Sequence, residues 1–192
     1  DWVIRMDLDY FIHENDFKKL KFYIEKYKES PAIVMPQYQF FTPERYQLKT
    51  KLCLVLNKKK FPNIKLNGGT DKMLATLDGN LLTYNNVPQV KIPIWQYDSM
   101  FRTKKIIGED RARFARAWKR TFGNYGDRGG DDPDIAFNAW FNMVKLRYSK
   151  HLFRKKINDH PRFIKDKLKD LNCEQFGFSA FGLKNNTKFN YF

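Results

Sequence analysis

Apolar and polar positions in the first half of the chain follow patterns typical of β-strands. The run from Trp2 to Ile12 is apolar and rich in β-branched residues, which predicts a buried strand. After Asn15 and Asp16, apolar residues recur at helical spacing and predict a helix that ends before Pro31. Further strands are predicted at residues 32–35, 48–56, 64–66 and 87–94. Residues 36–44 are predicted to form a loop with several aromatic side chains.

The second half of the chain changes to a helical pattern. The helix predicted at residues 104–122 has an apolar face made of Ile107, Phe114, Trp118 and Phe122. A second helix is predicted to begin at Asp132, because a proline and an acidic residue follow it, as is typical of a helix N-terminus. Its predicted buried face consists of Ile135, Ala139, Trp140, Met143 and Leu146. A last helix is predicted to start at Asp159.

The order of these elements predicts an α/β fold with a mixed, Rossmann-like sheet flanked by helices and a helical C-terminal half. We expect residues 1–103 to form a sheet-rich core and residues 104–192 a helical part of the same domain. A chain of 192 residues can bury a sizeable core as one domain. It begins with Asp1 on the approach to a predicted strand, so we expect it to be the later part of a larger protein.

Charge and cysteine content narrow the range of partners and compartments. The chain has 36 Lys and Arg against 21 Asp and Glu, and its net charge of +15 favours a nucleotide, a nucleic acid or an acidic glycan as partner. The two cysteines, Cys53 and Cys173, are too few for a disulfide scaffold, which indicates a reducing, cytoplasmic location. No run approaches the roughly 18 apolar residues of a membrane span, so we expect no transmembrane segment.

Two aspartates in the first predicted strand are the strongest chemical signal. Side chains alternate across a strand, so Asp7 and Asp9 are expected to point to one side and Leu8 to the other. Paired carboxylates at the end of a sheet strand suit Mg²⁺ or Mn²⁺ together with a phosphate. The plainer interpretation is that both residues only begin a turn, where aspartate is common.

Several classes of protein fit an Asp-x-Asp pair. Metal-dependent glycosyltransferases use it on a nucleotide-sugar diphosphate, haloacid-dehalogenase-like phosphatases use it as nucleophile and acid, and translesion polymerases use it for metals. A dehalogenase-like phosphatase needs a small hydroxyl residue soon after the pair, where Tyr10 and Phe11 stand. No later acids resemble those of a polymerase. A basic, aromatic-rich module that binds nucleic acid is the non-enzymatic alternative.

The order of weaker motifs resembles family-two-type glycosyltransferases of the GT-A fold, in particular the lipopolysaccharide-core and phage-type sugar transferases. The matching segments are Trp2 to Phe11, Asn15 to Tyr27, Leu52 to Asn57, Gly68 to Asp71, Pro93 to Tyr97 with Arg102, Lys104 to Phe122, and His160-Pro161. Two positions depart from the family pattern. Tyr10 replaces an acid and Gln96 replaces a histidine.

The resemblance implies a metal-dependent transferase, with inversion at the sugar carbon, that acts on a nucleotide-sugar donor. By this likeness, Asp7 and Asp9 would bind a manganese or magnesium ion, and Asp7 would also face the nucleotide. The general base would be Asp71, in a glycine-containing loop, or Asp110, beside Glu109 at a helix start.

The same likeness implies smaller roles for three further residues. Arg102 and Lys104 would contact the diphosphate, although an exposed helix start explains them equally well. His160 would complete the metal shell or contact the acceptor, with helix capping as the simpler alternative. The donor base, the sugar and the acceptor, whether glycan, lipid, protein or modified DNA, stay open.

Overall fold

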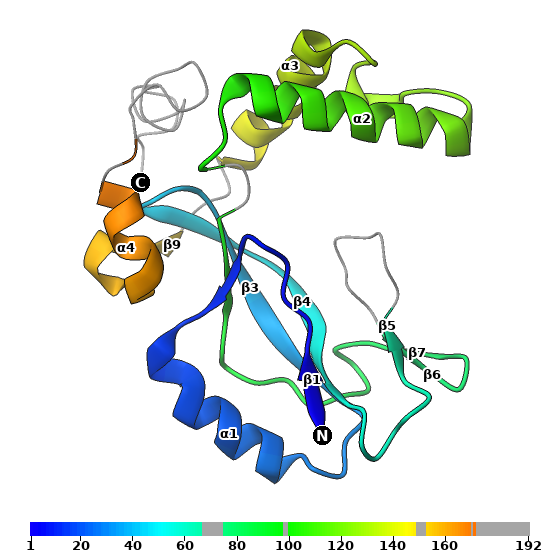
Figure 1. Ribbon diagram of the computed structural model, residues 1–192, viewed down its shortest axis with the longest axis vertical. Coiled ribbons are helices and arrows are strands. Elements are labelled where there is room, and N and C mark those ends of the chain that lie inside the picture. Colours follow the sequence, from blue (N-terminus) through cyan, green and yellow to red (C-terminus); the bar gives the residue numbers. More distant parts are fainter. Residues whose placement is uncertain (67–74, 98–99, 149–152, 170, 172–192) are drawn as a thin grey trace. The chain divides into compact units, whose positions relative to one another are not determined.

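The computed structural model describes residues 1–66, 75–97, 100–148, 153–169 and 171. These residues contain both strands and helices, as an α/β fold requires (Figure 1). The helices are α1 (Phe17–Lys26), α2 (Lys104–Phe122), α3 (Pro133–Tyr148) and α4 (Arg162–Lys169), with 3₁₀ turns η1 (Glu14–Asp16), η2 (Gly126–Arg128) and η3 (Ile157–Asp159). The predicted α/β class is confirmed. No helix in the described ranges is long and apolar enough to cross a membrane.

The strands form two sheets. The larger, six-stranded sheet has the order β1-β4-β3-β8-β2, and β9 pairs with β4. Its strands are β1 (Trp2–Ile4), β2 (Tyr10–Ile12), β3 (Ala32–Thr42), β4 (Arg45–Asn57), β8 (Ile94–Gln96) and β9 (Phe153–Arg154). The smaller sheet consists of β5 (Lys65–Leu66), β6 (Ala75–Leu77) and β7 (Asn80–Leu82). Because β3 runs parallel to β8 while β2 runs antiparallel to it, the larger sheet is mixed.

The chain divides into two compact units. The first consists of Asp1–Gln39, Leu48–Gln96 and Asp159–Lys165, and the second of Phe40–Gln47, Tyr97–Asn158 and Asp166–Phe192. Strands β3 and β4 have residues in both units.

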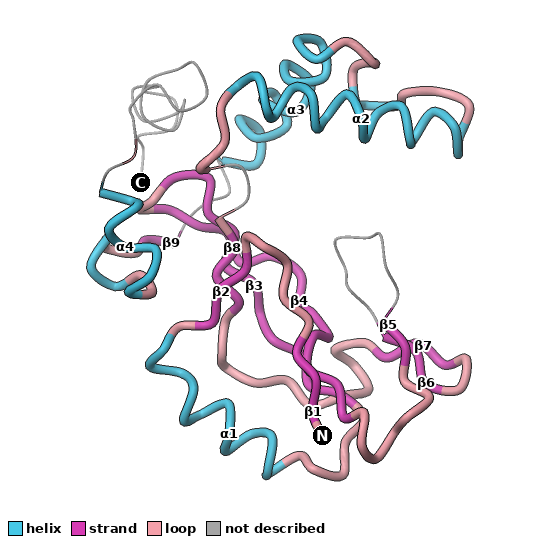
Figure 2. Tube along the Cα trace, viewed as in Figure 1, coloured by secondary structure: helices cyan, strands magenta, loops and turns pink. Residues whose placement is uncertain are grey.

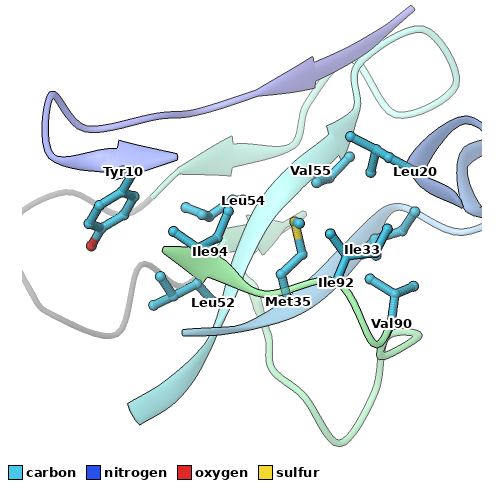
Figure 3. Close-up of a cluster of buried hydrophobic side chains, with 10 residues drawn as sticks. All are labelled: Tyr10, Leu20, Ile33, Met35, Leu52, Leu54, Val55, Val90, Ile92 and Ile94. Carbon is cyan, nitrogen blue, oxygen red and sulfur yellow. The ribbon is translucent and has the colours of Figure 1, made fainter. Parts of the chain in front are cut away.

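The first unit has a core of β-branched and other aliphatic side chains between the sheet and α1. Ten buried residues form it, shown in Figure 3: Tyr10, Leu20, Ile33, Met35, Leu52, Leu54, Val55, Val90, Ile92 and Ile94. Leu20 is the buried residue of α1, and Tyr23, Ile24 and Tyr27 pack beside it. The predicted apolar spacing of this helix is thus what attaches it to the sheet.

The loop predicted at residues 36–44 is wrong, because β3 continues to Thr42. Pro36 has no N–H group to donate to a neighbouring strand. It lies between an isolated bridge at Val34 and the regular β3–β8 pairing that begins at Gln37, so the interruption costs no hydrogen bond of that ladder. The strand predicted at 87–94 is also shorter, with only Gln89 bridged before β8 begins at Ile94.

The turn between β6 and β7 follows from its sequence. Asp78 and Gly79 have φ angles of 50° and 82°, which is the left-handed backbone of a tight hairpin turn. Glycine adopts this conformation freely, and aspartate tolerates it better than most residues. Strands β6 and β7 pair antiparallel across this turn, with Leu77 opposite Asn80.

In the second unit, α2 and α3 pack closely through small residues rather than through the predicted aromatic face (Figure 1). The buried residues of α2 are Ile107, Gly108, Ala112 and Ala115. Phe114 and Phe122, predicted to be buried, are 50% and 55% exposed. Small side chains let the two backbones approach, which leaves the larger rings at the margin of the contact.

The predicted face of α3 is wrong at both of its ends. Ile135 is 54% exposed and Leu146 is 74% exposed. The fully buried side chains are Ala136, Phe137, Trp140, Phe141 and Val144. The predicted start of the helix is confirmed, because the Asp132 carboxylate accepts hydrogen bonds of 2.9 Å from the N–H groups of Asp134 and Ile135.

Candidate functional site

Asp7 and Asp9 lie in a tight turn and not on one strand. The predicted strand from Trp2 to Ile12 is two short strands, β1 and β2, separated by this turn (Figure 2). The N–H of Tyr10 donates to the carbonyl oxygen of Asp7 at 3.0 Å, which closes the turn. Leu8 is fully exposed at its tip, so it does not anchor the opposite face of a sheet. The turn-forming tendency of aspartate outweighed the apolar pattern here.

The carboxylate of Asp7 is partly accessible and has a cationic neighbour. Its Oδ1 atom lies 3.7 Å from Nε of Arg5, and the two side chains are 39% and 32% exposed. Ion pairs at such exposure stabilise a fold by only about 0–1 kcal/mol. The pair can therefore open without much loss, and Asp7 is available to a ligand.

The carboxylate of Asp9 is attached to the end of β8. Gln96, the last residue of that strand, donates a hydrogen bond of 3.0 Å from Nε2 to Oδ2 of Asp9. Tyr10 pairs directly with Gln96 across β2 and β8, so the strand register brings the turn to this position. Asp9 therefore lies at the carboxyl end of β8, a strand that runs parallel to β3. Open α/β sheets bind their ligands at the carboxyl ends of parallel strands.

The donor set of the turn suits a hard cation that arrives with a ligand. Two carboxylates are the number that Mg²⁺ commonly takes from a protein when phosphate oxygens and water complete its shell. Across the described part of the chain, no three His, Cys, Asp or Glu side chains gather into a metal-binding group. An ion bound at this turn would therefore need oxygens from its substrate.

Three other predicted residues, Arg102, Lys104 and Asp110, lie on α2 or directly before it, in the second unit. Asp110 forms an ion pair with Arg102, whose Nη1 atom lies 3.3 Å from Oδ2 of Asp110, and a second ion pair with Arg113. Lys104 pairs with Asp134 at 2.9 Å and lies over the ring of Phe137. Both cations thus have carboxylate partners within the unit. The first candidate for the base, Asp71, and its loop from Gly68 lie outside the described residues, as does Cys173.

His160 is buried in the first unit, only 1% exposed. Its ring meets the ring of Trp95 edge-on at a centroid distance of 5.2 Å. The ring of His13 lies near the same indole, at 5.6 Å. His160 does not join Asp7 and Asp9 in a group of three metal ligands. Its position is that of a core side chain.

Cys53 is an unreactive core residue. It is 1% exposed in β4 and not in a disulfide. Burial raises the pKa of its thiol to about 11, with a smaller opposing effect from the N–H group of Ala75. Since the thiolate is the nucleophilic form, Cys53 cannot serve as a nucleophile near neutral pH.

Glu14 closes the N-terminus of α4. Its two carboxylate oxygens accept hydrogen bonds of 3.2 and 3.3 Å from the N–H group of Arg162, the first residue of that helix. Burial alone would raise the pKa of Glu14, but hydrogen bonds from its own N–H group and from that of Arg162 outweigh it, and the pKa is below its ordinary value of 4.5. The capping acceptor of this helix is thus Glu14 rather than Asp159 or His160.

Replacing Glu14 with glutamine is expected to lower stability by about 0.3–1 kcal/mol at neutral pH, since an amide keeps an acceptor but loses the charge at the helix terminus. A group with a lowered pKa in the folded state stabilises above its unfolded pKa and loses that effect as pH falls. The difference between wild type and Glu14→Gln should therefore be present at pH 7 and smaller at pH 3. Urea denaturation at both pH values measures it.

Glu25→Gln is the matched control. Glu25 is an exposed residue near the C-terminal end of α1, where it forms an ion pair with Lys28 and does not cap a helix N-terminus. It should cost less than Glu14→Gln at pH 7. Equal costs for the two variants would mean that the helix terminus contributes nothing specific.

The glutamines beside the turn were not predicted as site residues. Gln37 is 1% exposed and donates from Nε2 to Oε1 of Gln96. Gln96 had a signal in the sequence, as the position where the family resemblance expects a histidine. For Gln37, the signal was that Gln37 and Gln39 are two positions apart in an aromatic segment. If that segment is a strand, as β3 is, both side chains lie on the same face of it.

Comparison of the chain with known protein families, with curated proteins and with solved structures finds no match. Evidence about its function therefore comes from its own residues and their arrangement.

Proposed function

We propose that this chain carries the metal and diphosphate site of a glycosyltransferase that uses a nucleotide-sugar donor and has a GT-A-like fold. The observation that carries the proposal is the contact between Asp9 and Gln96. It links the acidic turn to the end of a parallel strand, and it leaves Asp7 partly exposed beside it. Accessible carboxylates at such an edge are what a cation bound to a diphosphate needs.

The order of motifs along the chain supports the same reaction class. The Asp-x-Asp pair and the segment that ends at Tyr97 are two of the motifs that carry the family resemblance. Their members Asp9 and Gln96, 87 positions apart in the sequence, are in hydrogen-bond contact. A turn that served only to connect two strands would not require a specific contact to that second motif.

Asp7 and Asp9 would hold a Mn²⁺ or Mg²⁺ ion, which would offset the negative charge that develops on the departing nucleoside diphosphate. The Arg5 side chain, near Asp7, supplies a positive charge on the same turn. Arg102 and Lys104 are proposed diphosphate contacts only after release from their carboxylate partners. His160 would need to leave the core to reach an ion, so we assign it a packing role.

For an inverting transfer, a carboxylate must accept the proton of the attacking hydroxyl group. Asp71 is the first candidate. Asp110 is the second, and its ion pairs with Arg102 and Arg113 would have to open before it could accept a proton. The acceptor stays open. A cytoplasmic location belongs to the same proposal, because two cysteines with a buried thiol at Cys53 suit a reducing compartment.

The proposal is tested by thermal unfolding of the chain with uridine or guanosine diphosphate, each with and without Mn²⁺. We expect the midpoint to rise only when nucleotide and metal are both present. A ligand at 100 times its dissociation constant adds about 2.7 kcal/mol of stability, enough for a shift of several degrees. The same screen on nucleotide sugars, read as slow hydrolysis, would identify the donor.

Two results would contradict the proposal. The first is stabilisation by nucleotide that is indifferent to Mn²⁺ and to chelator. The second is tight binding of an oligonucleotide that weakens steeply with salt while no diphosphate binds, which would favour a nucleic-acid-binding module.

A further inference from the structure

Four polar side chains form a connected row at the end of the first unit's core. The side-chain nitrogen Nε2 of Gln96 donates to Asp9 at 3.0 Å, and Nε2 of Gln37 donates to the side-chain oxygen Oε1 of Gln96. The same nitrogen of Gln37 lies 3.4 Å from the hydroxyl of Tyr10. The strands β2, β8 and β3 lie side by side and supply all of them except Asp9, which is the last residue of the turn. Figure 3 shows Tyr10 at this end of the apolar cluster.

The chemistry of Asp9 fixes the direction of every hydrogen bond in the row. An ionised carboxylate only accepts, so Gln96 must present its NH₂ group to Asp9. The side-chain oxygen Oε1 of Gln96 then points away from Asp9 and toward Gln37, so Gln37 must present its own NH₂ group to that oxygen. Reversing either amide would set two acceptors or two donors against each other. The orientation of Gln96 is therefore imposed from both sides.

Gln37 holds its place at a cost in stability. It is 1% exposed, and its Oε1 atom has no hydrogen-bond partner among the described residues. A buried amide with an unpaired oxygen is destabilising relative to an apolar side chain of the same shape. A side chain kept only for packing would be better as methionine or leucine, since its neighbours in this sheet, such as Met35 and Ile94, are apolar.

We propose that Gln37 is a positioning residue that orients the amide of Gln96 and thereby holds the carboxylate of Asp9 in the geometry for a divalent cation. The role for the cation rests on the proposed function, whereas the orientation of the amide does not. In this arrangement Gln96 serves Asp9 as a hydrogen-bond donor and is not itself a metal ligand. Gln37 thus has the role of the outer partners that orient the ligands of metal sites.

The first test is Gln37→Met, which keeps the length of the side chain and removes its hydrogen bonds. We expect the thermal midpoint to stay the same or rise, while affinity for Mn²⁺ with uridine or guanosine diphosphate falls by about 10–100-fold, as is typical for such outer partners. A role in packing alone predicts that the affinity of Gln37→Met equals that of wild type, whatever its midpoint, and that result would overturn the inference.

The second test is Gln37→Glu, read as a pH profile. An ionised carboxylate at this position only accepts, so the amide of Gln96 must turn its NH₂ group away from Asp9, and binding should be weak at neutral pH. Burial raises the pKa of such an introduced acid, and in its protonated form it can donate to Gln96 again. Affinity in this variant should therefore recover between about pH 8 and pH 6, while wild type shows no such gain.

The ionisable groups that this row itself contains are Asp9 and the hydroxyl of Tyr10, and Asp7 and Arg5 belong to the same turn as Asp9. They are common to wild type and to Gln37→Met, so a pH response confined to Gln37→Glu comes from the introduced group. A flat profile in Gln37→Glu, with affinity equal to that of wild type, would contradict the assigned orientation.

The orientation can also be measured without any ligand. The side-chain NH₂ protons of Gln96 should exchange slowly with solvent in wild type, because one of them is held by Asp9, and faster in Gln37→Met. Nuclear magnetic resonance of the side-chain amide reports both rates. If the rates agree, Gln37 does not orient Gln96, whatever binds nearby. If the rates differ and wild type binds no diphosphate, the orientation stands and the proposed function fails.

Discussion

Asp9→Asn is expected to abolish Mn²⁺-dependent binding of a nucleoside diphosphate while leaving the chain folded. The amide has nearly the shape of the carboxylate and still has one oxygen for the hydrogen bond from Gln96. It lacks the negative charge that a hard divalent cation requires. Because loss of an outer partner already costs 10–100-fold in metal affinity, loss of a direct ligand should cost at least about 100-fold. Calorimetric titration with and without Mn²⁺ measures this.

A matched control for this substitution is Asp78→Asn, which removes the same charge from another tight turn. Asp78 has a φ angle of 50° in the hairpin of the smaller sheet, a conformation that asparagine accepts. Asp78→Asn should bind as wild type does. Retained metal-dependent binding in Asp9→Asn, or equal loss in both variants, would show that the acidic turn does not hold the cation.

The bounds of α2 and the start of α3 were well predicted from the sequence, whereas the last helix begins at Arg162 and not at the predicted Asp159. The bounds predicted for α2, residues 104–122, match the structure, where Thr103 caps the first turn and Gly123 ends the helix with a φ angle of 77°. For α3, Asp132 and Pro133 marked the start. These signals are local, since a cap depends on two or three neighbouring residues, and they need no knowledge of the tertiary contacts.

Helix faces were predicted less well, because they depend on the partner. Periodicity weights large apolar residues, and it therefore selected Phe114 and Phe122 on α2. The contact with α3 instead buries Gly108, Ala112 and Ala115, which recur at helical spacing but carry little hydrophobic weight. Close approach of two backbones is a property of the helix pair that neither sequence pattern contains.

The candidate site was predicted in part. The sequence identified Asp7 and Asp9, but it placed them on one strand because the residues around them are apolar. Local turn formation at Leu8 prevailed. The contacts of Asp9 could not be predicted from the sequence, because Gln96 and Gln37 belong to strands that are distant in sequence. The register of the sheet brings these strands together. Of the two proposed bases, the structure describes only Asp110, whose ion pairs the sequence pattern could not reveal.

Gly108→Val is expected to loosen the α2–α3 pair, with a loss of about 3 kcal/mol. A Cβ atom added at residue 108 would lie 2.7 Å from the carbonyl oxygen of Pro133 and 3.2 Å from its carbonyl carbon. These are backbone atoms at the start of α3, so they cannot move aside as a flexible side chain would. The two helices would have to separate, which uncovers Ile107 and Phe137, both buried.

Hydrogen exchange of the α2 and α3 amides measures this loss as a free energy of local opening. Lys105→Val is the matched control, because it places the same β-branched residue on an exposed position of the same helix. It should cost only about 0.5 kcal/mol, the difference in helix propensity. If Gly108→Val costs no more than Lys105→Val, the helices have room between them, and the small residues of α2 do not set their separation. A cost several times larger in Gly108→Val, confined to these two helices, would identify the Gly108–Pro133 approach as the contact that holds the pair together.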